Sequence, residues 1–115
     1  MPHFVIDCSD SILKYTTEER LLNEVFLAAE STQLFVKGEI KVRVNSFENW
    51  QVGDRKDDFI HVFSSIMEGR TSAQKKLLLD KIIEVLVTLF PEVYNIAMNI
   101  SEFQKTLYLN RSQYE

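Results

Sequence analysis

The second residue of the chain has a chemistry that depends on its position. Pro2 follows directly on Met1, so removal of the methionine exposes a cyclic secondary amine in place of an amide nitrogen. An ordinary α-amino group titrates at about 8, and an apolar pocket or neighbouring cations lower its pKa because both disfavour the ammonium form. Such an amine is neutral near physiological pH and can take and return a proton. Many proteins begin Met-Pro only because of processing, so this interpretation needs support from the rest of the chain.

Two strand–helix–strand units are predicted to position this amine. Apolar runs and alternating apolar and polar residues predict strands over residues 3–8, 39–47, 59–67 and 95–103. Apolar residues at helical spacing predict helices over about 17–31 and 71–90, the second of which is stopped by Pro91. Capping boxes are predicted at the two helix starts, Thr16 with Glu19 and Thr71 with Gln74.

This order predicts a single α+β domain over residues 1–115, with a β-α-β-β-α-β chain path and two layers. Each crossover is expected to be right-handed and to give a parallel strand pair, with both helices on one face of a four-stranded sheet. The other face is then bare. Phe59, His61, Phe63 and the row of Lys41 and Arg43 are expected there, which favours oligomerisation to cover it.

The composition excludes several classes of protein. A net charge of -4 argues against a nucleic-acid partner. No apolar run is long enough to span a membrane, and the first residues lack the pattern of a signal peptide. Cys8 is the only cysteine, which fits a reducing compartment, so a cytoplasmic, soluble protein is expected. His3 and His61 are not spaced with other ligands as a metal set.

Several segments, in the correct order along the chain, carry a resemblance to a known family. The sequence closely resembles the bacterial 5-carboxymethyl-2-hydroxymuconate delta-isomerases, members of the tautomerase superfamily. The most specific match is the opening decapeptide, MPHFVIDCSD, and the others are residues 38–44, 50–51, 59–62, 69–71 and, more weakly, 106–110. The predicted order of strands and helices is also the one that this tautomerase-like fold requires.

The resemblance implies a homotrimer that needs no metal and no organic cofactor. It implies that Pro2 is the acid–base group and that two cationic positions bind a dicarboxylate. Arg70 matches one of these positions, and a helix start suits an anion because free N–H groups add to the guanidinium. The family pattern Ile-Arg-x-Arg-Val is matched at Arg43, but Lys41 stands in place of the other arginine. Lysine keeps the charge and loses the planar two-pronged geometry.

The sequence therefore predicts an isomerase that moves a double bond in an unsaturated 2-hydroxy or 2-oxo dicarboxylate, in the breakdown of aromatic compounds. Either Lys41 or Arg43 would act with Arg70, although Arg70 could instead be solvated or paired with Glu68, and Lys41 could lie on a solvated strand face. A chain that keeps Met1 is expected to be inactive. Two other classes stay open: a non-catalytic trimeric ligand-binding or interaction module with the same fold, and a ferredoxin-like regulatory domain.

Overall fold

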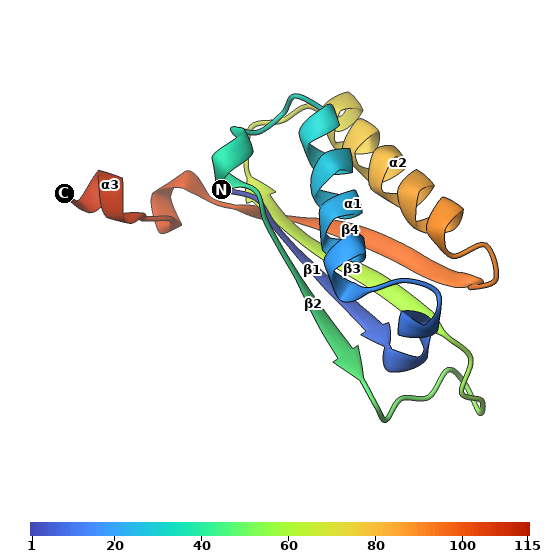
Figure 1. Cartoon of the computed structure of the whole chain (residues 1–115). Coiled ribbons are helices and arrows are strands. Elements are labelled where there is room, and N and C mark those ends of the chain that lie inside the picture. The colour runs from blue at the N-terminus through green and yellow to red at the C-terminus, as the bar shows by residue number, and fades with distance from the viewer.

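The computed structural model describes all 115 residues and has two layers, a four-stranded sheet and two long helices that cover one of its faces (Figure 1). The strands are β1 (His3–Ser9), β2 (Lys41–Phe47), β3 (Phe59–Met67) and β4 (Asn95–Phe103). The helices are α1 (Glu18–Ser31), α2 (Ser72–Leu89) and the short α3 (Arg111–Tyr114), with single 3-10 turns at Asp10–Lys14, Lys37–Glu39 and Lys105–Leu107. The predicted α+β class and the placement of both helices on one face are confirmed.

The order of strands in the sheet is β2-β1-β3-β4. β1 runs parallel to β2, β3 runs parallel to β4, and the two central strands are antiparallel, as the two crossovers predicted. His3 is opposite Lys41 on one side and Ser65 on the other. The starts of β1 and β2 therefore lie at the same end of the sheet as the ends of β3 and β4.

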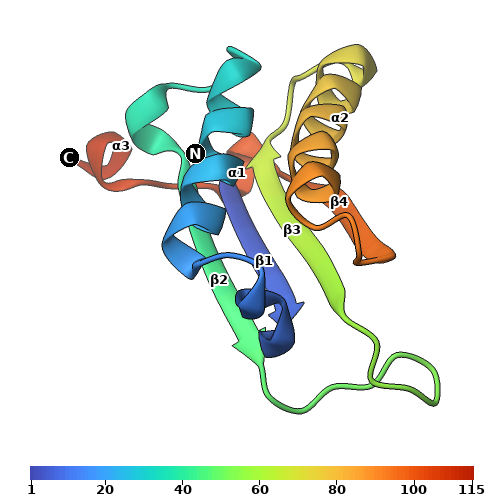
Figure 2. The same ribbon diagram turned by 45° about the vertical axis from the view of Figure 1, so that its right-hand side comes forward.

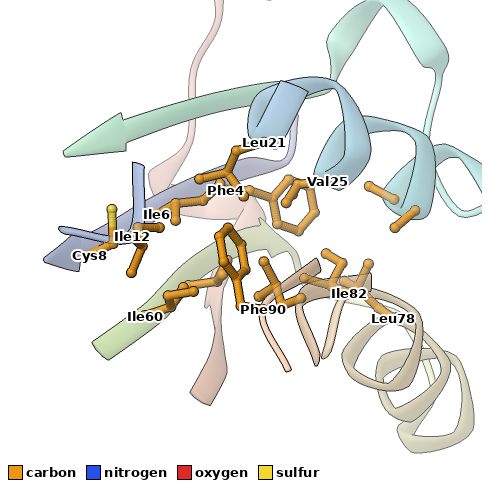
Figure 3. Close-up of a cluster of buried hydrophobic side chains, with 14 of the residues drawn as sticks. Phe4, Ile6, Cys8, Ile12, Leu21, Val25, Ile60, Leu78, Ile82 and Phe90 are labelled. Carbon is orange, nitrogen blue, oxygen red and sulfur yellow. The ribbon is translucent and has the colours of Figure 1, made fainter. Parts of the chain in front are cut away.

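The core lies between the sheet and the two long helices. Alternate residues of β1, among them Phe4 and Ile6, are fully buried on the helix side because successive side chains of a strand point to opposite faces. They meet the apolar stripes of α1 and α2, which include Leu21 and Ile82 (Figure 3). Each such side chain stabilises the fold by about 1.5–3 kcal/mol relative to an exposed one. A single cluster of buried residues joins both halves of the chain.

The start of α1 differs from the prediction. The hydroxyl of Thr17 accepts a hydrogen bond from the main-chain N–H of Arg20 at 3.1 Å, so the cap is one residue later than the predicted pair of Thr16 and Glu19. The hydroxyl of Thr16 is buried and has no hydrogen-bond partner. By contrast, the predicted capping box of Thr71 and Gln74 is present at the start of α2.

The second strand also begins later than predicted, because residues 37–39 form a 3-10 turn and the ladder starts at Lys41. Within β2 the predicted alternation holds: Val42 and Val44 pack against the core, while Arg43 is exposed on the opposite face. That face carries the partly exposed rings of Phe47, Phe59, His61 and Phe63. No helix of the chain has the length and apolar character that crossing a membrane requires.

Candidate active site

Pro2 lies at the point where β1 and β2 begin together. Its side chain is buried, and its carbonyl accepts a hydrogen bond from the main-chain N–H of Lys41 at 3.1 Å. This bond continues the parallel ladder by one step beyond the pair of His3 and Lys41. The amino terminus is thereby held beside the first residues of β2.

Arg70 reaches the same end of the sheet from the turn between β3 and α2. This turn needs a glycine, because Gly69 has φ +116°, a conformation that other residues rarely adopt. The guanidinium of Arg70 donates to the carbonyl of Leu34 at 2.7 Å and to that of Met67 at 3.2 Å, and it lies 5.0 Å from the centre of the Phe35 ring. A guanidinium has five N–H donors, so three remain for an anion.

The predicted alternative in which Arg70 pairs with Glu68 is wrong. The carboxylate of Glu68 accepts instead from the main-chain N–H of Lys105 at 2.6 Å. No ion pair of the chain involves Arg70, whose charge is held by backbone carbonyls alone. Its position is thus fixed by backbone carbonyls, and its charge has no ion-pair partner in the chain.

The side chains of Lys41 and Arg43 have different neighbours in the structure. The ammonium of Lys41 is half-buried, donates to the carbonyl of Glu39 at 3.1 Å and lies 3.9 Å from the sulfur of Met1. The guanidinium of Arg43, two residues further along the same face of β2, is exposed and lies 3.2 Å from Nδ1 of His3. Lys41 therefore approaches the amino terminus, and Arg43 approaches His3.

The electrostatics of the amino terminus agree with this separation. The pKa of the Met1 amine is lowered from its ordinary value of 8.0, chiefly because partial burial disfavours its charged form. Glu39 acts in the opposite sense, and the positive charges of Arg70 and Lys41 lower the pKa further. Arg43 is not among the charges that shift it. An amine held here loses its proton more readily than one in water.

Glu39 is the one charged residue near this amine that the sequence interpretation missed. The parallel register pairs His3 with Lys41, and two steps back along both strands the same offset brings residue 39 beside residue 1. The predicted parallel pairing of the two strands implies that Glu39 lies near residue 1 only if the register of the pair is known. The sequence does not fix that register, so Glu39 was not identified.

His3 shares the electropositive environment. Its pKa is lowered from 6.5, first by burial and then by the charges of Arg43, Lys41 and the amino terminus. Its ring meets that of Phe103 edge to face, with centroids 6.1 Å apart. The neutral imidazole is therefore the form that the fold favours.

The surface pockets of the single chain do not include the candidate site. The three surface pockets lie elsewhere, and none is lined by Pro2, Lys41 or Arg70. The largest, of about 600 Å³, lies at the opposite end of the sheet between Trp50 and Tyr94. No group of three or more His, Cys, Asp or Glu side chains is arranged to hold a metal ion.

Comparison with known proteins finds the same fold and one sequence family. The family model described as 5-carboxymethyl-2-hydroxymuconate isomerase matches residues 2–114. The 5-carboxymethyl-2-hydroxymuconate Delta-isomerase of Escherichia coli is 26% identical over 114 residues, which cover 93% of this chain and 90% of the relative. A crystal structure of a 5-carboxymethyl-2-hydroxymuconate isomerase from Deinococcus radiodurans R1 superposes with a TM-score of 0.85 at 21% identity, covering 99% of this chain and 94% of that one. A structure described as an F6 fused 4-OT wild type asymmetric trimer gives 0.79 at 16% identity, covering 96% and 94%.

Proposed function

Because the chain belongs to the 5-carboxymethyl-2-hydroxymuconate isomerase family, we propose that it moves a double bond in an unsaturated 2-hydroxy or 2-oxo dicarboxylate of that kind. The acid–base group is the amine of Pro2, once Met1 has been removed. The observation that carries this proposal is the convergence of Pro2, Lys41 and Arg70 at one end of the sheet. The reaction belongs to the breakdown of aromatic compounds and uses no cofactor.

The proton transfer starts from a neutral amine. For the Met1 amine, partial burial is the largest cause of a lowered pKa; Glu39 opposes it, and the charges of Arg70 and Lys41 add to it. We expect the same environment to act on the amine of Pro2. Pro2 takes a proton from the enol hydroxyl, or from an allylic carbon, of the bound substrate. The electron pair moves along the conjugated chain, and the resulting ammonium returns the proton to a carbon further along. No atom is gained or lost, so the product is an isomer of the substrate.

The two cations have different tasks in this mechanism. Arg70 is fixed by two carbonyls and uses its remaining N–H groups to bind one carboxylate. Lys41 stabilises the negative charge that develops on the carbonyl oxygen, or binds the second carboxylate. Arg43 is the weaker candidate for either task within one chain, because its guanidinium lies against His3.

The active form is a homotrimer in this proposal. The face of the sheet opposite the helices carries several partly exposed aromatic rings, and a second copy of the chain is a suitable cover for them. A similar fold is described as a trimer in the F6 fused 4-OT structure.

A comparison of two forms of the protein tests the mechanism. One form begins at Pro2, and the other has a single glycine before Pro2, with both verified by intact mass. The ketonisation of 2-hydroxymuconate, followed by ultraviolet absorbance, is expected only with the first form. Its kcat/KM should rise with pH through a limb below 8, because the neutral amine is the base. Equal rates for the two forms would contradict the role of Pro2, and a folded trimer inactive in both forms would favour the non-catalytic module.

A further inference from the structure

A carboxylate lies beside the cations of the candidate site. Glu39 ends the 3-10 turn that precedes β2, and both views place this turn next to the amino terminus (Figures 1 and 2). The ladder pairs His3 with Lys41, and the carbonyl of Pro2 accepts from the main-chain N–H of Lys41 at 3.1 Å. Continued two steps back, the same register brings Glu39 beside the first residue of the chain.

The backbone of the turn fixes the position of Glu39. Its main-chain N–H donates to the carbonyl of Val36 at 3.0 Å. Its own carbonyl accepts from the ammonium of Lys41 at 3.1 Å. Glu39 therefore stays next to Lys41 through main-chain contacts, which do not depend on its side chain.

The side chain of Glu39 has no partner in the chain. It is half-buried and takes part in no ion pair, and the one side-chain hydrogen bond that reaches Glu39 ends on its main-chain carbonyl. Its charge nevertheless acts on the amino terminus. Burial lowers the pKa of the Met1 amine most, Glu39 raises that pKa, and Arg70 and Lys41 lower it further. The fold favours the neutral form of His3, the other titratable group here.

The balance of charges at the site bears on the substrate. When the amine is neutral, Arg70 and Lys41 supply two positive charges, and Glu39 offsets one of them. A dicarboxylate bound by Arg70 places its second carboxylate near Lys41, where it also meets the negative charge of Glu39. Like charges repel, and partial burial limits the screening by salt. A substrate whose second end is uncharged avoids this repulsion.

We propose that Glu39 is a specificity-determining residue of this site. Its carboxylate weakens the binding of a second substrate carboxylate, so the site accepts 2-hydroxydienoates with one carboxylate alongside the dicarboxylates. This inference deepens the proposed function and rests on it for the class of substrate. Glutamine at position 39 has the same shape without the charge, and it should restore a strong preference for dicarboxylates.

The test compares two substrates that differ by one carboxylate. 2-Hydroxymuconate has a carboxylate at each end, and 2-hydroxypenta-2,4-dienoate is the same dienol acid without the second one. Both are assayed with protein that begins at Pro2, on the plateau of each pH profile. Glu39→Gln is expected to raise the ratio of kcat/KM, dicarboxylate over monocarboxylate, by about fivefold, mainly through a lower KM for the dicarboxylate. Glu39→Asp keeps the charge and should stay within about twofold of the native ratio.

Glu92→Gln is the matched control. Glu92 lines the pocket at the opposite end of the sheet, so this variant loses the same charge far from the amine. It should leave the ratio of the two substrates unchanged. An equal rise of the ratio in Glu92→Gln and Glu39→Gln would reflect net charge alone and would overturn the role of Glu39.

A second set of measurements does not depend on turnover. The chain has two prolines, and only Pro2 carries a free amine once Met1 is removed, so ¹⁵N NMR of proline-labelled protein follows that amine through a pH titration. Glu39→Gln is expected to lower the pKa of this amine, because a negative charge that stabilises the ammonium is lost. Adipate, an unreactive dicarboxylate, should bind Glu39→Gln about fivefold more tightly in calorimetry, and hexanoate should bind both forms equally.

Failure of this inference and failure of the proposed function give different results. If the native protein is active, and Glu39→Gln changes neither the ratio of the substrates nor the binding of adipate, Glu39 has no role in specificity and the enzyme proposal stands. If neither substrate reacts, while adipate binds Glu39→Gln more tightly and the amine pKa falls, the proposed reaction is contradicted and the role of Glu39 is supported. Unchanged adipate binding in an inactive protein overturns both.

Discussion

The main-chain N–H of Lys41 donates to the carbonyl of Pro2, and this bond of 3.1 Å sets the distance between the amine and a cation. The bond uses only backbone atoms, so the side chain of Lys41 is free to act on what lies beside the amino terminus. The fold fixes one end of that side chain and leaves the other half-buried near Met1. A substitution of the Lys41 side chain can therefore test its effect on catalysis separately from its effect on fold stability.

Lys41→Gln is expected to lower kcat/KM by about 10- to 100-fold, which corresponds to the loss of a charge-assisted hydrogen bond of about 1.5–3 kcal/mol. The midpoint of urea unfolding should change little, because the backbone bond to Pro2 stays. Lys41→Arg should recover most of the rate, since it restores the charge. A Gln variant as active as the native protein would remove Lys41 from the mechanism.

Arg70→Lys is expected to weaken substrate binding although it keeps the charge. The ammonium cannot bond to the carbonyls of Leu34 and Met67 in the same geometry and still present two donors to a carboxylate. KM should rise by about tenfold or more. Arg43→Gln is the control and should change KM by no more than about threefold, because Arg43 is exposed and lies on His3. A larger rise in KM for Arg43→Gln than for Arg70→Lys would exchange the roles of the two arginines.

Much of the fold could be predicted from local sequence. The bounds of β3 and β4 agree with the predicted strands over residues 59–67 and 95–103, because in each strand residues that pack on the core alternate with more exposed ones. The start of α1 could not be predicted to the residue, since Thr16 and Thr17 offer the same hydroxyl. Which of the two caps the helix depends on the backbone path that leads from the preceding 3-10 turn into α1.

The candidate site was predicted only in part, because Pro2, Lys41 and Arg70 come from three separate segments. Pro2 and Arg70 were found from position and resemblance, and the choice between Lys41 and Arg43 stayed open. Alternation places both on one strand face, and only the three-dimensional position of the amino terminus distinguishes them. The bonds from Arg70 to Leu34 and Met67 join backbone atoms of no particular residue type, so they leave no signal in the sequence.

The cap of α1 can be tested by two neighbouring substitutions. Thr17→Ala removes the oxygen that accepts from Arg20 and is expected to lower the free energy of unfolding by about 1 kcal/mol. Thr16→Val removes a buried hydroxyl that has no partner, so it should be neutral or stabilising. Urea unfolding of both variants measures the difference. A larger loss for Thr16→Val would place the cap where the sequence first predicted it.

Cys8 is expected to be nearly inert in the folded protein. Burial, together with the negative charges of Glu18, Asp7 and Asp10, raises the pKa of its thiol from 9.0 to about 12. The thiolate is the reactive form, so alkylation by iodoacetamide at pH 8 should be about a thousandfold slower in the folded protein than in urea. Rapid labelling of the folded protein, detected by intact mass, would contradict this environment.

The stability of the protein should depend on pH through His3. Its pKa in the folded state lies below the ordinary value of 6.5, because burial and the charges of Arg43, Lys41 and the amino terminus disfavour the imidazolium. As the pH falls through 6.5 the unfolded state binds a proton that the folded state does not, so the free energy of unfolding decreases until the folded pKa is passed. The loss should appear as a falling urea midpoint between pH 7.5 and the folded pKa, with the carboxylates still ionised over the upper part of that range. His3→Gln should flatten the curve, and Arg43→Gln should make it shallower by removing the strongest neighbouring charge. If the plots of urea midpoint against pH stay parallel for the native protein and His3→Gln, another group titrates in this range. The pH dependence of stability then does not come from His3.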